Sequence, residues 1–246
     1  MSNELQKQQA ARRVLVVGIY LTDKENLAPH ITQELAQSSD WNVEQRWVSL
    51  GKSQPGSNMA PFTVQVSDTF SPKFLLLNQL LEKIDLYDFE YIIVSDDDIH
   101  LPAGFVDRYL ALVSRHDLAV AQPARTHDSY IDHWFVEQLD GIDGRRTRFV
   151  EIGPLFSLHH KAFDYFLPFD EASPMGWGSD FVWPVLAEKY SLRMGIIDAV
   201  PVAHNLRKPV AYYDHRASAK HMSKYLAERP HLSKKDAFFI LESYVG

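Results

Sequence analysis

A short apolar run that ends in three consecutive carboxylates constrains the fold of this chain more than any other feature. Residues 91–94 (Tyr-Ile-Ile-Val) are rich in β-branched side chains and bounded by polar residues, which is typical of a buried central strand. Asp96, Asp97 and Asp98 follow directly. Because ligands of an open α/β sheet bind beyond the carboxyl ends of its strands, the triplet is predicted to lie in a ligand crevice.

The spacing within this triplet indicates a divalent metal site. If the backbone stays extended, Asp96 and Asp98 project to one side and Asp97 to the other. Two carboxylates on one side repel each other unless a cation lies between them, and oxygen ligands favour Mg²⁺ or Mn²⁺. An acidic turn that caps the next helix is the alternative, but a cap requires one Asp rather than three.

Composition limits the classes to which the protein can belong. The 246 residues suffice for one large α/β domain, and the net charge of -7 argues against general electrostatic binding to nucleic acid. The chain has no cysteine, so disulfides, thiolate metal sites and a Cys nucleophile are excluded. The polar segment 1–12 lacks the apolar stretch of a secretory signal, and no apolar run is long enough to span a bilayer. We therefore expect a soluble, cytoplasmic protein.

Strand and helix patterns alternate along the chain. Strands are predicted at 13–20, 41–50, 91–94, 118–121, 149–158 and 193–202, and helices at 26–37, 72–84, from Pro102 onward and at 181–186. This alternation predicts a mainly parallel sheet with right-handed crossovers. Residues 51–62 form a loop by composition, and the polar segment 125–148 is interpreted as a solvated insertion in preference to a flexible acceptor loop.

The order of several motifs resembles the GT-A glycosyltransferases. The helix that contains Lys73 and Asn78 leads into the strand that ends in Asp-x-Asp. Further along come Phe149-Val-Glu-Ile-Gly-Pro, Gly176-Trp-Gly-Ser-Asp180 and Met194-Gly-Ile-Ile-Asp-Ala-Val-Pro-Val-Ala-His204. This later set is similar to a narrower, uncharacterised glycosyltransferase-like family, a domain of unknown function best known from land plants.

The resemblance implies a fold and a domain organisation. We expect a single GT-A-like domain over 13–206, a three-layer sandwich with a nucleotide-sugar half (13–123) and an acceptor half (124–206). A helical tail (207–246) follows, whose basic residues are interpreted as a solvated helix face. The partners implied are a nucleotide-sugar donor and an acceptor of unknown class, whether glycan, lipid or small molecule.

The resemblance also implies the residues that bind the donor. Asp98 is expected to be the principal metal ligand, with Asp96 binding the ribose or the metal through water. His204 resembles the second, late metal ligand of many GT-A enzymes, and a neutral imidazole tolerates Mn²⁺ well. Lys73 can reach a phosphate as a point charge, and Asn78 belongs to the same donor-binding helix.

The loop that begins at Gly176 is the second predicted site. Gly176 and Gly178 allow the backbone to turn tightly and to approach a ligand, and Trp177 can stack on a sugar ring. Asp180 opens the following helix and is the candidate general base, with a helix N-cap as its structural alternative. Weaker candidates for the base are Glu151, Asp170 and Glu171.

These residues favour a metal-dependent glycosyltransferase that acts with inversion. A metal-dependent nucleotidyltransferase or phosphoester hydrolase can use the same carboxylates and is the first alternative. A non-catalytic nucleotide or sugar binder that retains the fold is the second alternative.

Overall fold

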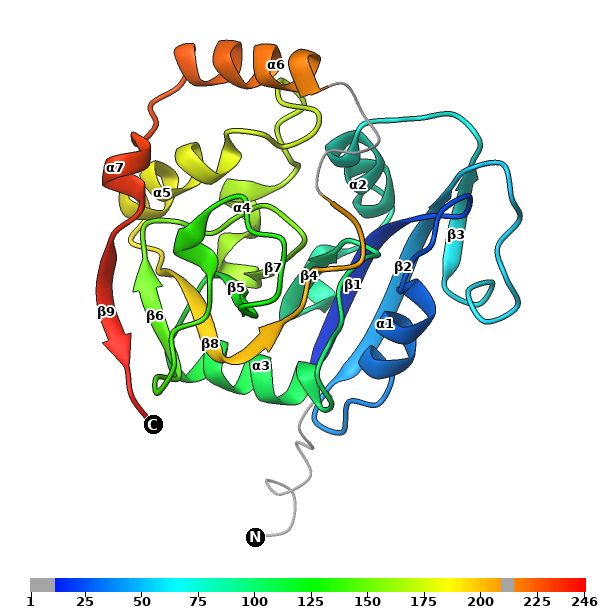
Figure 1. The fold of residues 1–246 in the computed structure, drawn as a ribbon, viewed down its shortest axis with the longest axis horizontal. Coiled ribbons are helices and arrows are strands. Elements are labelled where there is room, and N and C mark those ends of the chain that lie inside the picture. The colour runs from blue at the N-terminus through cyan, green and yellow to red at the C-terminus, as the bar shows by residue number, and fades with distance from the viewer. Residues whose placement is uncertain (1–11, 209–214) are drawn as a thin grey trace, which may run out of the picture.

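The alternating apolar strands assemble into one central sheet. The structure is a computed structural model that describes residues 12–208 and 215–246, and within them nine strands lie in the order β3-β2-β1-β4-β7-β5-β8-β6-β9 (Figure 1). The strands are β1 (Arg13–Leu21), β2 (Asn42–Leu50), β3 (Thr63–Ser67), β4 (Tyr91–Ser95), β5 (Val120–Arg125), β6 (Gly144–Thr147), β7 (Leu155–His159), β8 (Met194–Val202) and β9 (Ile240–Tyr244). The helices are α1 (Ala28–Leu35), α2 (Lys73–Leu81), α3 (Phe105–Arg115), α4 (Phe163–Phe166), α5 (Ser179–Lys189), α6 (His215–Ala227) and α7 (Lys234–Ala237).

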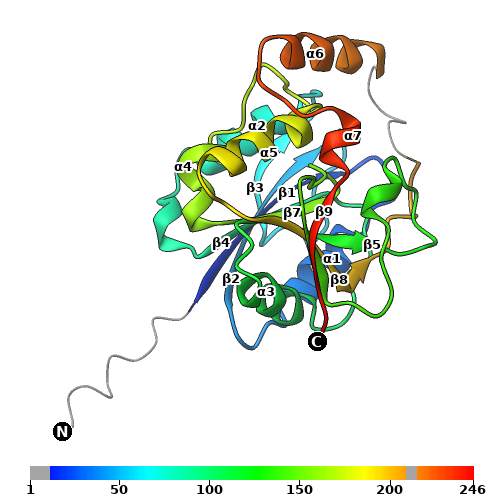
Figure 2. The same cartoon turned by 90° about the vertical axis from the view of Figure 1, so that its left-hand side faces the viewer.

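The sheet is the middle of three layers because its central strands are apolar on both faces. Val14 and Ile93 pack with α1 and α3 in one core cluster, whereas Leu15 and Ile92 pack with α2, α4 and α5 in another. Figure 2 shows these two groups of helices on opposite faces of the sheet. Helix α6 lies outside this sandwich, at one end of the molecule (Figures 1 and 2).

The point at which the strand order reverses lies between β1 and β4. β1 pairs in parallel with β2 on one side and with β4 on the other, and β2 pairs in parallel with β3. Gly18 allows this close packing, because a Cβ there would lie 2.3 Å from the Trp47 ring and 2.8 Å from the Ser95 carbonyl. The Asp triplet therefore follows a central strand beside the first strand, as predicted, at the place where α/β sheets bind ligands.

The remaining half of the sheet is mixed. β7 runs antiparallel to β4 and β5, β8 runs parallel to β5, and β6 runs antiparallel to β8 and β9. The predicted strand 149–158 is shorter, since only Leu155–His159 pairs with the sheet. Three strands were not predicted. They are β3, which follows the loop, β6, which lies within the segment expected to be a solvated insertion, and β9, which forms the end of the tail that was predicted to be helical.

Two further points concern the chain outside this core. The predicted N-terminal segment, apart from Arg12, lies outside the described residues, as does the part of the tail over 209–214. Of the helices in the described part of the chain, none combines the length and apolarity that crossing a membrane requires.

Candidate functional site

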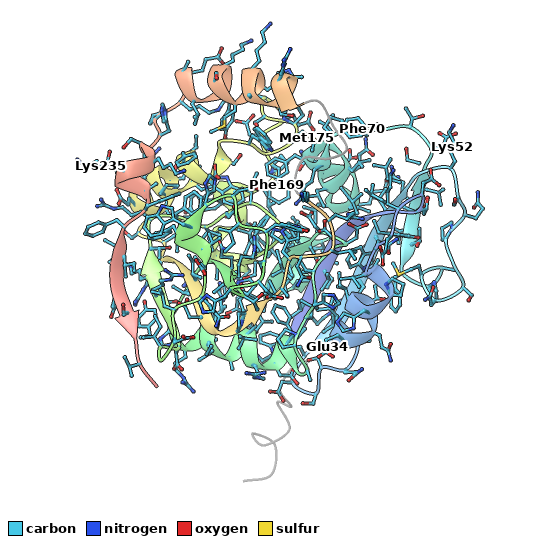
Figure 3. The ribbon with its side chains drawn as sticks, viewed as in Figure 1. Glu34, Lys52, Phe70, Phe169, Met175 and Lys235 are labelled. Atoms are coloured by element: carbon cyan, nitrogen blue, oxygen red, sulfur yellow. The ribbon has the colours of Figure 1, made fainter. Side chains whose placement is uncertain are left out.

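A cleft of about 730 Å³ opens at the carboxyl ends of β1, β2 and β4. Its lining includes all three aspartates of the triplet and the loop residues Trp177, Gly178 and Asp180, so both predicted sites face one cavity. Phe70 and Met175 also line it, and Figure 3 shows both in the upper part of the molecule, below α6.

The Asp triplet does not follow the alternation expected of a strand. β4 ends at Ser95, so the chain bends through the triplet and all three side chains line the cleft. Lys73 Nζ donates to Asp96 Oδ1 over 2.6 Å. Asp97 accepts the Leu21 backbone N–H over 2.7 Å, which ties the triplet to the end of β1. The predicted opposition of Asp97 to the other two aspartates is therefore wrong, because the extended backbone ends one residue too early.

Arg207 is a site residue that the sequence reasoning missed. Its guanidinium bonds Asp97, and its Nη2 lies 3.1 Å from Asp98 Oδ2. Burial raises the pKa of Asp97 to about 6, although the bonds from Arg207 act in the opposite direction. The sequence signal for Arg207 is weak, because a single Arg three residues after His204 looks the same as the other basic residues of the tail.

His204 lies beside Asp98, as the resemblance implied. His204 Nε2 is 3.3 Å from Asp98 Oδ1. A backbone bridge between His100 and Ala203 holds the end of β8 against the triplet and so places this imidazole. Burial opposes ionisation of Asp98, but His204 and Arg207 outweigh it, and the pKa of Asp98 is lowered. His100 itself is exposed and does not line the cleft.

Asp98 and His204 form a pair that can hold a divalent cation. They supply one carboxylate oxygen and one imidazole nitrogen that lie 3.3 Å apart. A Mg²⁺ or Mn²⁺ site is commonly completed by substrate phosphates and water. In residues 12–208 and 215–246 no group of three or more acidic or His side chains converges on a metal position. Asp96 engages Lys73 through Oδ1, so a contribution of this oxygen to the cation has to compete with that ion pair. The donor set fits a cation shared between the protein and a diphosphate.

Asp180 also lines the cleft, from the first turn of α5. Gly178, with φ +92°, is the residue that caps this helix, so Asp180 is not its N-cap. Asp180 is 6% exposed, and its Oδ1 has no hydrogen-bond partner among the described residues. Burial raises the pKa of Asp180 to about 8, and the nearby Glu151 carboxylate adds to this effect. A buried carboxyl with a pKa close to the operating pH is suited to proton transfer.

His133 is a second residue that the sequence reasoning missed. Its Nε2 lies 3.9 Å from Asp180 Oδ2, and burial lowers its pKa. The interpretation of 125–148 as a solvated insertion is wrong, because Phe135 and Val136 are buried and carry the segment into the core. The short apolar pair that follows His133 was the available signal.

Glu151, one of the weaker candidates for the base, lines the cleft but is already paired. Arg125 Nη2 lies 2.7 Å from Glu151 Oε2, and Arg125 is 1% exposed. The same nitrogen donates to the Gly153 carbonyl. Glu151 neutralises a buried guanidinium, so taking up a proton would leave that guanidinium unpaired. Asp180 has no such ion pair to break and is therefore the better candidate to accept a proton.

The glycine-rich loop is positioned by packing on both sides. A Cβ on Gly176, which has φ +85°, would lie 2.6 Å from the Phe74 ring and from Ile152 Cδ1. A Cβ on Gly178 would lie 3.2 Å from Leu226 of α6. Trp177 and Gly178 line the cleft, whereas Gly176 supports them from behind.

Asn78 lies outside the cleft. Its side-chain amide exchanges two hydrogen bonds of 2.8 Å with the backbone of Phe169 and donates to Glu171. Asp170, likewise outside the cleft, pairs with Arg229 at 2.8 Å. Asn78, Asp170 and Glu171 therefore stabilise the segment that precedes the glycine-rich loop. Their contacts do not support a donor-binding or catalytic role.

Solved structures of the same fold contain nucleotides and sugars. TarS of S. aureus (residues 1–349), in complex with UDP-GlcNAc, has a TM-score of 0.58 at 12% identity, covering 88% of this chain and 66% of that one. The mannosyltransferase PcManGT of Pyrobaculum calidifontis, in complex with GDP-Man and Mn²⁺, has a TM-score of 0.56 at 15% identity, covering 90% and 66%. GalNAc-T7 with UDP, GalNAc and Mn²⁺ has a TM-score of 0.55 at 8% identity, covering 87% and 47%.

These likenesses establish the fold. The chain has the GT-A-type α/β fold that the motifs predicted, and it spans 66% of the length of the first two solved chains and 47% of the third. No protein-family model and no curated protein matches the sequence. The narrower likeness to the family from land plants therefore stays a prediction.

Proposed function

We propose that this protein is a metal-dependent glycosyltransferase that moves a sugar from a nucleotide-sugar donor to an acceptor hydroxyl with inversion. One observation carries the proposal: Asp98 with His204, and the separate carboxyl of Asp180, line a single cleft at the switch point of a GT-A-type sheet. Nucleotide sugars bound to proteins of this fold support the choice of donor.

The dimensions of the sheet suit a nucleotide laid across its carboxyl edge. Neighbouring strands lie about 4.8 Å apart, so the ends of β3 and β4 are separated by roughly 14 Å. Asp68 and Phe70, which follow β3, line the cleft at one extreme, and the Asp triplet lies in the middle. We place the nucleoside near the ends of β2 and β3 and the diphosphate near Lys73, Asp98 and Arg207.

The charges around the diphosphate account for departure of the leaving group. Lys73 and Arg207 present cationic donors where the two phosphates are placed. Asp98 and His204 would hold a divalent cation. When bound, this cation would neutralise the charge that develops on the leaving diphosphate. We place the sugar near Trp177 and Asp180, because both line the same cleft.

Asp180 is the proposed general base. It takes the proton of the acceptor hydroxyl as that oxygen bonds to the anomeric carbon and the bond from this carbon to the diphosphate oxygen breaks. Attack from the face opposite the leaving group inverts the configuration. General-base assistance of this kind contributes about 10²–10⁴-fold in rate.

Product analysis tests the reaction class. A panel of nucleotide sugars is incubated with Mn²⁺ and a panel of glycans, lipids and small hydroxyl compounds. The proposal predicts free nucleoside diphosphate together with a glycosylated acceptor, both lost in Asp180→Asn. Release of pyrophosphate or inorganic phosphate as the first product would instead identify a nucleotidyltransferase or a phosphoester hydrolase.

A further inference from the structure

The Asp98 carboxylate is fully engaged within the protein. Arg207 Nε and Nη2 lie 3.3 and 3.1 Å from Asp98 Oδ2, and His204 Nε2 lies 3.3 Å from Oδ1. The side chains of Arg207 and Asp98 are only 10% and 13% exposed, so water screens their attraction weakly. A cation that coordinates Asp98 through Oδ2 must therefore compete with the guanidinium for that oxygen.

The guanidinium is held in place by groups other than Asp98. It also bonds Asp97, whose side chain is 5% exposed and is itself fixed by the Leu21 N–H at the end of β1. A second anchor is the Glu25 carbonyl, to which Arg207 Nη1 donates over 2.8 Å. Asp97 thus positions Arg207 against Asp98 in the free protein.

A diphosphate offers the guanidinium a better partner. Arg pairs with phosphate oxygens through two parallel charge-assisted hydrogen bonds, which suits a planar fork. The two phosphates are placed directly beside the triplet, within reach of a side chain that already lines the cleft. Movement of Arg207 onto the diphosphate would free Asp98 Oδ2.

We propose that Arg207 is an internal competitor for Asp98, and that a nucleoside diphosphate draws Arg207 away and so opens Asp98 to the divalent cation. Asp97 is the positioning residue of this exchange. The inference rests on the proposed function, because it requires nucleotide and cation to share one cleft. By linkage, Arg207 contributes equally to the effect of nucleotide on cation affinity and to the effect of cation on nucleotide affinity.

Direct measurement of Mn²⁺ affinity tests the exchange without recourse to activity. Free Mn²⁺ is measured by electron paramagnetic resonance, with and without UDP or GDP. In Arg207→Met we expect Mn²⁺ alone to bind about tenfold more tightly than in the wild type, because the competing cation is gone. The enhancement of Mn²⁺ affinity by nucleotide should fall by a similar factor.

Two further variants separate competition from loss of charge or of folding. Arg207→Lys keeps the charge, but one ammonium cannot bond both carboxylates at once, so Mn²⁺ affinity should still rise, by a smaller factor. This variant carries the test if Arg207→Met does not fold. Arg115→Gln removes a charge from a side chain on α3 that is 62% exposed and should change neither affinity.

The outcomes distinguish this inference from the proposed function. If both Arg207 variants bind Mn²⁺ alone no more tightly than the wild type, the competition is refuted. If neither UDP nor GDP binds the wild type in the presence of Mn²⁺, the donor assignment fails. The affinities for Mn²⁺ alone would still decide whether Arg207 competes for Asp98.

Discussion

At the scale of single residues, two buried or partly buried ion pairs of the cleft contrast with the buried carboxyl of Asp180. Lys73 bonds Asp96, and Arg125 bonds Glu151, at 2.6 and 2.7 Å. Asp180 has no comparable partner among the described residues, and burial, with help from Glu151, raises its pKa to about 8. The ionised form that a base requires is therefore populated only as the pH approaches and passes this value.

This ionisation predicts the pH dependence of catalysis. The value of kcat/KM for the wild type should rise with pH and level off above about 8, because the free enzyme must first lose the Asp180 proton. On the plateau, Asp180→Asn should lower kcat/KM by at least about 10²-fold while donor affinity is unchanged. Asn keeps the shape of Asp but cannot act as a base, and Gly178 rather than residue 180 caps α5, so near-normal turnover in this variant would eliminate Asp180 as the base.

The same ionisation predicts an effect on stability. The pKa of Asp180 is higher in the folded protein (about 8) than the ordinary 3.8, so the folded state binds the proton more tightly. The Asp180 proton therefore contributes to the free energy of unfolding. This contribution is fully present below the ordinary Asp pKa and is lost as the pH rises through the pKa of the folded protein. Asp180→Asn has no proton to lose at this position, so its stability does not fall in this way. Its Tm should match the wild type near about pH 4 and exceed it near about pH 9.

Thermal melts across this range measure the difference directly. Burial also raises the pKa of Asp97 and of Asp198 to about 6, but both groups are present in either protein and cancel in the comparison. Melting curves of the two proteins that stay parallel from acid to alkaline pH would contradict the assigned ionisation.

At the scale of elements, the glycine-rich loop is fixed by packing as well as by backbone conformation. In Gly176→Ala, the new Cβ would lie 2.6 Å from both Phe74 and Ile152, at a φ of +85°. We expect a left-handed penalty of about 1–2 kcal/mol together with an overpacking cost of about 1–3 kcal/mol in the free energy of unfolding.

Gly141→Ala is the matched control. Gly141 has a φ of +80°, but a Cβ there has no atom within 4 Å. Its replacement should show the conformational penalty alone, of about 1–2 kcal/mol. Urea denaturation of the two variants measures the difference. Equal losses in both would show that the packing of this loop against α2 contributes nothing.

How far the elements could be predicted depends on the range of the interactions that form them. The β4 strand and the position of its end at the cleft could be predicted, because a local apolar run and three adjacent carboxylates carry that information. Edge strands β3 and β9 were missed, since Val64, Ile240 and other exposed apolar residues give no burial pattern. Arg207 was missed because its partners lie more than 100 residues earlier in the chain.

At the scale of the whole molecule, the two halves of the sheet supply different chemistry to one cleft. The parallel half, through β1 and β4, brings the Asp triplet and the ends of β2 and β3 together. The mixed half contributes the end of β8, with His204, and helix α5, with Asp180. The metal pair and the general base that we propose therefore draw on both halves of the sheet.

The central claim is that this cleft binds a nucleoside diphosphate sugar together with a divalent cation. Calorimetric titration of UDP- and GDP-sugars, with Mn²⁺ or with a chelator, tests it in the wild type and in Asp98→Ala. We predict that the wild type binds one of these donors at least about tenfold more tightly with Mn²⁺, and that Asp98→Ala loses this dependence. Equal affinities in both proteins, with and without the cation, would contradict the account.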